Sequence, residues 1–175
     1  DILPDTGSSG GAGNVLFADA VQAYRTLSPR LQELVKGTTV LSVLANGYRN
    51  LEPYGSEYAE TLTNHPAVTQ PVVGWDPQTN TSWLNVNPAY SVRIRELAAD
   101  ESHAILPMLC RHVTKPDHCL RLQYEVGDIV VFDNHRLQHY AVSDYYPEPR
   151  RIWRMSFQAV SIQNNIAILG VDSKQ

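Results

Sequence analysis

Apolar and polar positions alternate most regularly in the last third of the chain. Over residues 120–125, LRLQYE, apolar side chains occupy every second position, as in a strand with one buried face. Segments rich in β-branched and aromatic residues follow, separated by turn residues that include Gly127-Asp128. The pattern predicts four strands, over residues 119–126, 129–134, 137–142 and 150–160.

The first part of the chain mixes short strands with short helices. Residues 15–17 predict a strand, and two helical segments follow, separated at Ser28-Pro29 and ended near Gly37. Residues 38–46, TTVLSVLAN, are mostly β-branched or apolar and predict another strand. The stretch VTQPVVGWDPQTNTSWLNVNP predicts a pair of strands around a turn that begins at Asp76-Pro77.

The clearest helix lies in residues 101–114, ESHAILPMLCRHVT. Ile105, Leu109 and Val113 fall on one helical face, and acidic residues stand at the start of the segment. Pro107 interrupts it, so this residue must lie in the first turn or kink the helix.

Many short strands with few helices predict a mainly β protein with flanking helices. A chain of 175 residues is long enough for one domain with a substantial core. We therefore expect a single antiparallel sandwich or jelly-roll domain over residues 1–175. The tryptophans at predicted sheet positions, Trp75, Trp83 and Trp153, are expected in its core.

The charge and composition of the chain limit the classes of molecule that it is expected to bind. The net charge of −4 and the pI near 5.8 give no electrostatic footprint for nucleic acid. No apolar run approaches the about 20 residues that span a bilayer, and the first residues lack the features of a signal peptide. Cys110 and Cys119 lie in no metal-binding spacing and read as free thiols in a reducing compartment. We expect a cytoplasmic protein with a small-molecule ligand and neither a nucleic-acid nor a membrane partner.

Candidate chemistry gathers in residues 133–154, DNHRLQHYAVSDYYPEPRRIWR. On a strand, Arg150 and Arg154 share one face, and burying two guanidinium groups there is costly unless an anion such as a carboxylate lies between the sheets. His139 on a neighbouring strand could bind a metal as neutral imidazole. Spacing alone favours the ordinary alternatives, a solvated sheet face and a structural histidine, so the residues by themselves indicate a jelly roll with an anion site.

The segment GDIVVFDNHRLQHYAVSDY, with RRIWR after it, closely resembles the C-terminal signature of the taurine dioxygenase (TauD/TfdA-like) family of Fe(II)- and 2-oxoglutarate-dependent dioxygenases. Two upstream segments are similar to the same family, GNVLFADAVQAYRTLSP and NHPAVTQPVVGWDPQTNTSWLNVNPAYSVRI. The likeness runs from about Leu16 to Phe157. It implies a double-stranded β-helix, that is, a cupin-like jelly roll.

The resemblance also implies roles for individual residues. His139 falls on the distal histidine of the iron-binding triad, and Arg150 on the arginine that holds the far carboxylate of 2-oxoglutarate. Arg154 falls on the arginine that meets the anionic group of the substrate or the other end of the cosubstrate. The implied cofactors are Fe(II), 2-oxoglutarate and O₂. The implied reaction hydroxylates a small, anionic organic substrate and releases succinate and CO₂.

The other two metal ligands of this family form a His-x-Asp/Glu motif, which the chain lacks. None of its six histidines has an acidic residue two positions later. We therefore expect that the N-terminal portion of such a domain is absent from this sequence.

Three further positions depart from the family or extend the pattern. Val15 stands where many relatives have a threonine that hydrogen-bonds 2-oxoglutarate, and Asn85 where an apolar or aromatic residue often lines the substrate pocket. Asn87 is a candidate for a hydrogen bond near that pocket.

Two alternatives to the dioxygenase function are a non-catalytic jelly roll that binds a small carboxylate or other anion without iron, and a fragment that depends on a partner chain. A homo-oligomer remains open.

Overall fold

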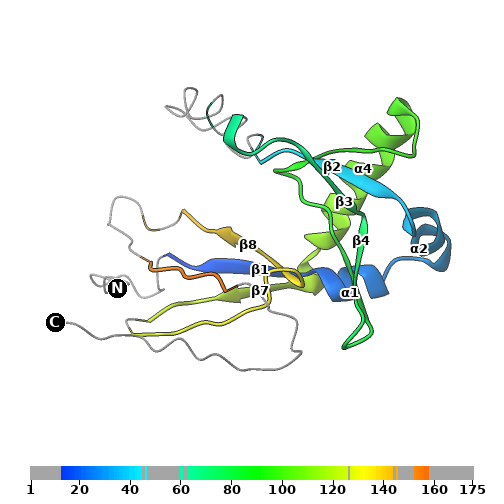
Figure 1. Cartoon of the computed structure of the whole chain (residues 1–175). Helices are drawn as coiled ribbons and strands as arrows, with labels where there is room; N and C mark the ends of the chain where they lie inside the picture. The colour runs from blue at the N-terminus through cyan, green and yellow to red at the C-terminus, as the bar shows by residue number, and fades with distance from the viewer. Residues whose placement is uncertain are drawn as a thin grey trace.

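The computed structural model describes residues 13–44, 46, 60, 63–125, 127–143, 145 and 152–157. Its elements are short strands with two short helices near the start of the described chain and one longer helix after the sixth strand (Figure 1). They are β1 (Val15–Asp19), α1 (Ala20–Arg25), α2 (Pro29–Val35), β2 (Thr39–Ser42), β3 (Val68–Pro71), β4 (Val73–Asp76), β5 (Thr81–Leu84), β6 (Ser91–Ile94), α4 (Ala99–Val113), the 3₁₀ helix η2 (Pro116–His118), β7 (Cys119–Leu122) and β8 (Leu137–Ala141).

The strands form three small antiparallel sheets. Their orders are β7-β1-β8, β3-β2-β6 and β4-β5. In Figure 1 the β7-β1-β8 sheet lies to one side, while α4 lies against the sheet that contains β2 and β3. The order β7-β1-β8 places the first described strand between the last two.

The alternation of side chains along β1 sets the faces of the β7-β1-β8 sheet. Phe17 pairs with Leu120 of β7 and with His139 of β8, so these three side chains share a face. Val15 lies two residues earlier on the same face and is buried, like Phe17. One face of this sheet therefore combines apolar residues of β1 with His139.

Local sequence signals begin and end the short helices as predicted. The Asp19 carboxylate accepts hydrogen bonds from the backbone N–H groups of Val21 and Gln22, which caps α1 at the end of β1. The Ser28 hydroxyl accepts a bond from the third residue after it, and a proline opens α2. Gly37 follows α2 with a φ of +76°, a conformation that favours glycine.

The predicted long helix is confirmed as α4. Leu109 and Val113 are fully buried on its inner face, and the Glu101 carboxylate accepts a bond from the Ala98 N–H at its start. Pro107 lies inside the helix on the exposed side, beyond the first turn. Among the described residues, no helix combines the length and the apolar character needed to cross a membrane.

The core joins α4 to the two sheets beside it. Its largest fully buried side chains share an aliphatic character and come from these elements and their connections: Leu84, Ile94, Leu109, Val35, Val40, Val72, Val86 and Val113. Cys110 packs against the same cluster, where burial raises the pKa of its thiol to about 11, and both cysteines are free. The expectation of free thiols is confirmed.

The hairpin β4-β5 confirms the predicted strand pair and its turn. Asp76 accepts hydrogen bonds from the Gln78 N–H and the Thr79 hydroxyl, and Asn80 adopts a φ of +49°. Gly74 and Trp83 are directly opposite each other in the hairpin. The Trp83 indole occupies the space that a Cβ atom would need at position 74, so only glycine fits there without a shift of the ring.

The predicted strand over 129–134 and part of the predicted core are wrong, and so is the described part, residues 152–157, of the strand predicted over 150–160, whose other residues lie outside the described ones. The structure assigns no strand to residues 129–133 or 152–157, although β propensity is high in both. A strand needs a neighbouring ladder, and these segments pair with none of the described strands, so Ile129 and Val131 stay 89% and 91% exposed. Likewise Trp75 and Trp153 are exposed, because one lies on the outer face of a two-stranded hairpin and the other in an unpaired segment.

Candidate functional site

His139 stands in the middle of β8, on the same face of the sheet as Phe17. Its imidazole ring lies 5.3 Å from the ring of Phe132 and 6.2 Å from that of Phe17, centroid to centroid, and the two phenyl rings are 4.9 Å apart. Phe132 comes from the segment that leads into β8, so two separate parts of the chain orient the histidine. The three rings form an aromatic cluster, defined here as Phe17, Phe132 and His139.

The surroundings of His139 favour the neutral imidazole. Desolvation by neighbouring protein atoms lowers the pKa of His139, and the positive charge of Arg154 lowers it further, although part of the ring stays open to solvent. Neither ring nitrogen has a hydrogen-bond partner among the described residues. A neutral imidazole with an available nitrogen is the form that binds a metal ion.

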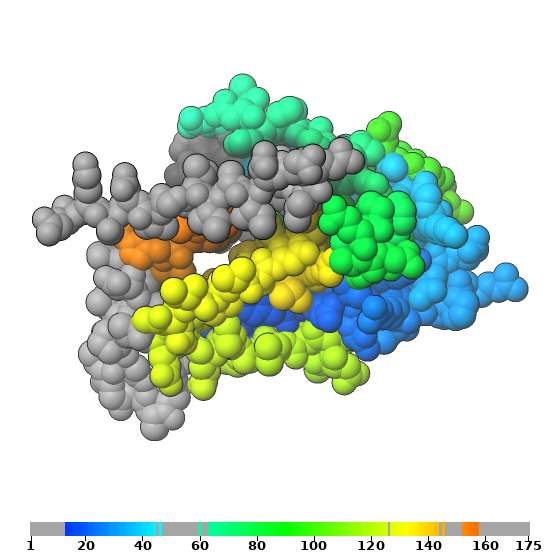
Figure 2. Space-filling view, turned by 60° about the horizontal axis from the view of Figure 1, so that its bottom comes forward, coloured from blue at the N-terminus to red at the C-terminus, as the bar shows by residue number. Residues whose placement is uncertain are grey.

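The structure brings Val15 to the face of His139 and Arg154 into the neighbourhood of the imidazole. Val15 lies opposite Ala141, two pairs along the ladder from the Phe17–His139 pair. Arg154 is close enough to His139 for its charge to act on the imidazole. Figure 2 shows its segment, residues 152–157 in orange, on the same side of the molecule as the yellow surface that includes the start of β8. Arg150 lies outside the described residues.

The two predicted asparagines lie elsewhere. The Asn85 side chain donates to the backbone carbonyl of Pro71, at 3.0 Å, which ties the end of β5 to the end of β3. The Asn87 side chain donates to the Gln138 side chain, also at 3.0 Å. Because Gln138 precedes His139 on a strand, the two side chains point to opposite faces, and the contact of Asn87 is with the far face of β8. The assignment of both asparagines to a substrate stays a prediction.

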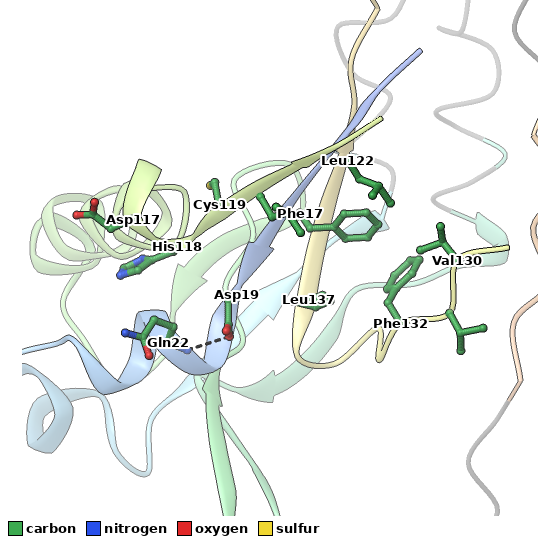
Figure 3. Close-up of a pocket in the computed structure, with 12 residues that line it drawn as sticks. Phe17, Asp19, Gln22, Asp117, His118, Cys119, Leu122, Val130, Phe132 and Leu137 are labelled. Carbon is green, nitrogen blue, oxygen red and sulfur yellow. Dashed lines mark hydrogen bonds between the residues drawn. The ribbon is translucent and has the colours of Figure 1, made fainter. Parts of the chain in front are cut away.

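A cavity of about 390 Å³ adjoins the aromatic cluster on the same face of the sheet (Figure 3). Phe17 and Phe132 form part of its wall, and Leu122 and Leu137 contribute further apolar surface. Asp19 lies at the end near α1, where its carboxylate caps that helix. The twelve lining residues include no lysine or arginine, so the cation of the site, Arg154, lies outside the cavity.

Whether a metal ion can bind here depends on how many side chains could act as its ligands. The described residues contain no group of three or more histidine, cysteine, aspartate or glutamate side chains that could hold a metal ion. His139 fits as a single ligand, because its imidazole is neutral and its nitrogens are available. Further ligands would come from outside the described residues.

Sequence reasoning missed the residues that surround the histidine. Phe17 and Phe132 were recognised only as apolar positions, and Arg136 and Gln138, which fasten β8 to other elements, were not singled out. The alternation of side chains along β8 could have identified Arg136 and Gln138, because every second residue from Arg136 faces away from His139.

Three comparisons place these features beside known proteins. The model of the "Taurine catabolism dioxygenase TauD, TfdA family" matches residues 3–156. An "Alpha-ketoglutarate-dependent sulfonate dioxygenase" of Saccharomyces cerevisiae is 32% identical over 151 residues, which cover 85% of this chain and 36% of the relative. An "Alpha-ketoglutarate-dependent sulfate ester dioxygenase" of Pseudomonas putida is 27% identical over 161 residues, covering 89% and 53%.

Solved structures share the fold. A taurine dioxygenase from Burkholderia xenovorans matches with a TM-score of 0.64 at 24% identity, over 83% of this chain and 44% of that one. A complex of AAD-2 with Mn(II) and N-oxalylglycine matches with a TM-score of 0.68 at 22% identity, over 81% and 55%. These likenesses confirm the predicted jelly-roll class. The chain spans between about a third and about half of the length of these four relatives.

Proposed function

The chain belongs to the taurine dioxygenase TauD/TfdA family, and we propose that it contributes His139 to the iron centre of an Fe(II)- and 2-oxoglutarate-dependent dioxygenase. The proposed reaction hydroxylates a small anionic organic molecule and releases succinate and CO₂. A cytoplasmic location and a single-domain organisation stay predictions.

The observation that carries the proposal is the state of His139. The imidazole is held neutral, has no hydrogen-bond partner among the described residues, and faces the same side of the sheet as Val15. His139 is exposed, so its ring nitrogens are accessible from solvent and are available to a metal ion. The lowered pKa of His139 favours the neutral imidazole, which is the form that binds a metal ion, and the nearby Arg154 suits an anionic ligand beside it.

The residues of this chain would position the metal ligand and bind the anionic groups of the reactants. Iron(II) with bound 2-oxoglutarate and O₂ would supply the oxidising chemistry. Phe17 and Phe132 would restrict the orientation of the imidazole, because their rings lie 6.2 Å and 5.3 Å from it, centroid to centroid. Arg150 and Arg154 would pair with the carboxylates of 2-oxoglutarate or with the anionic group of the substrate. Val15 offers no hydrogen bond to a carboxylate, so the arginines would carry more of that binding.

The substrate class follows from the cation of the site and from the relatives. Two relatives are named for sulfonates and sulfate esters, both of which carry an anionic sulfur group. Arg154 is the described cation near His139, and a guanidinium can bind such a group through two parallel hydrogen bonds. We therefore propose a sulfonate or sulfate ester as the substrate.

The test compares two histidines four positions apart. In a protein that carries this chain together with the remaining metal ligands, and with Fe(II), 2-oxoglutarate and O₂ supplied, His139→Ala should abolish succinate formation and weaken Mn(II) binding. His135→Ala is the matched control, because His135 is exposed and packs against Trp83, 5.9 Å away, outside the site. Its succinate yield should stay near that of the unaltered protein.

Two results would count against the proposal. Equal succinate yields from His139→Ala and the unaltered protein would refute the ligand assignment. Binding of 2-oxoglutarate with neither Mn(II) binding nor succinate formation would instead favour the non-catalytic anion-binding alternative.

A further inference from the structure

Strand β8 carries a second set of contacts, on the face that points away from His139. Arg136 immediately precedes the strand and Gln138 is its second residue, so both alternate with Leu137 and His139. The side chains of Arg136 and Gln138 both reach the connected strands β4 and β5 or the residues just after β5.

Arg136 joins the turn before β8 to the tip of the β4-β5 hairpin. Its Nη2 donates to the Asp76 carboxylate at 2.6 Å and to the Thr79 hydroxyl at 2.7 Å, while its Nε pairs with the Asp133 carboxylate at 3.0 Å. Thr79, the Gln78 N–H and Arg136 lower the pKa of Asp76, so its carboxylate stays charged. The Arg136 carbonyl also accepts a hydrogen bond from the first backbone N–H of α1, at 2.9 Å.

Gln138 fastens the strand a second time, one pleat further on. Its side-chain nitrogen donates to the Val86 carbonyl at 2.6 Å, and its oxygen accepts from the Asn87 side chain at 3.0 Å. Both polar ends of the Gln138 amide are thereby used on the segment that follows β5.

These contacts matter because β8 is an edge strand of its sheet. Among the described strands it pairs with β1 alone. A strand held by one ladder can shift by two residues and still present the same face, and such a shift would carry His139 about 7 Å along β1. The imidazole would then leave Phe17 and Phe132. The two fastenings specify one register, since Asp76 and Val86 are fixed on other elements.

We propose that Arg136 and Gln138 are positioning residues that fix the register of β8 and thereby hold His139 in place for the metal ion. The inference rests on the proposed function for the role of His139. The fastening of β8 itself involves no metal ion and can be tested without one.

The test measures backbone hydrogen exchange in the two edge strands of the same sheet. In Arg136→Met and Gln138→Leu, the amides of β8 should exchange at least about tenfold faster, while those of β7 change little. The tenfold figure is the expected effect of losing a hydrogen bond to a charged group on local opening. Arg136→Lys should recover part of the protection, because one ammonium cannot reproduce the three contacts of the guanidinium. Arg30→Met, an exposed arginine of α2, is the matched control and should leave both strands unchanged.

A merely structural contribution would accelerate exchange in β7 and β8 alike, and that result would overturn the proposal. So would unchanged exchange in β8. A second measurement, made in a protein that carries this chain together with the remaining metal ligands, separates this inference from the proposed function: Mn(II) affinity should fall about tenfold in Arg136→Met. If exchange in β8 accelerates and the unaltered protein binds no Mn(II), the fastening stands and the metal site of the proposed function fails. If the unaltered protein binds Mn(II) and Arg136→Met binds it equally well, the positioning role is refuted.

Discussion

One threonine hydroxyl connects two buried histidines, and its removal gives the sharpest prediction about stability. Thr26 Oγ1 lies 3.0 Å from His112 Nε2 and 2.9 Å from His118 Nε2, and these histidines are only 8% and 7% exposed. His118 Nδ1 is 2.8 Å from a backbone carbonyl, so this nitrogen carries the hydrogen and Nε2 must accept one. The Thr26 hydroxyl also lies 3.0 Å from the Gln22 carbonyl and 3.2 Å from the Ala23 carbonyl, but among the described residues it is the hydroxyl within reach of His118 Nε2, and we assign its hydrogen to that nitrogen.

The magnitude follows from counting the partners that remain in Thr26→Val. Valine has nearly the shape of threonine, so packing is kept and only the hydroxyl is lost. His112 Nε2 keeps the Ala23 carbonyl, 2.9 Å away. His118 Nε2 loses its donor and becomes an unsatisfied buried acceptor, which costs about 1–3 kcal/mol. The free energy of unfolding should fall by that amount.

The assay is urea unfolding at pH 8, with Thr114→Val as the matched control. The Thr114 hydroxyl lies 3.4 Å from the carbonyls of Cys110 and Arg111 in its own helix, so its bonds are marginal and its removal should cost less than about 0.5 kcal/mol. Thr26→Ser keeps the hydroxyl and should lose less stability than Thr26→Val. Equal losses in Thr26→Val and Thr114→Val would refute the assignment of the Thr26 hydroxyl as the donor to His118.

Two further changes test contacts of the sheets. Gly74→Ala should lower the free energy of unfolding by about 1–3 kcal/mol, because the new methyl group would overlap the Trp83 indole; unchanged stability and an unchanged indole N–H resonance would contradict this. The Thr39 hydroxyl, at 2.6 Å, and the Thr39 N–H, at 2.7 Å, lower the pKa of Glu96, so its contribution is present above its unfolded pKa of about 4.3 and is lost as the pH falls through the lower folded value. Between pH 7 and pH 2 the unfolding midpoint should therefore fall less in Glu96→Gln than in the unaltered protein, and an equal fall would argue against the Glu96–Thr39 contact.

The parts of the fold that the sequence predicted correctly are those specified by nearby residues. Ser28 and Pro29 mark the start of α2, Gly37 marks its end, and the apolar face of α4 repeats at helical spacing. The β4-β5 turn likewise depends on Asp76 and on residues within four positions of it. Such signals need no knowledge of the rest of the chain.

The failures concern segments whose conformation depends on distant partners. Residues 129–133 have the composition of a strand, yet Ile129 and Val131 are almost fully exposed and no described strand pairs with the segment. The composition of a segment shows only whether its residues suit a strand. Formation of the strand also requires a neighbouring strand with free backbone hydrogen-bonding groups. Trp153 was misplaced in the core for the same reason, because its burial depended on a strand that did not form.

The candidate site shows the same division between local and distant information. The position of His139 on a strand was predictable, but the partners of its face were not, since Phe17 lies 122 positions earlier and meets it only through the β1-β8 register. The usual means of orienting a histidine ligand is a hydrogen bond from its second nitrogen to a carboxylate or carbonyl. No described residue supplies that bond, so the orientation depends on Phe17 and Phe132 and on the register of β8. A ligand oriented by packing tolerates little displacement of its strand, which is why the fastening of the opposite face by Arg136 and Gln138 bears on the chemistry of this one.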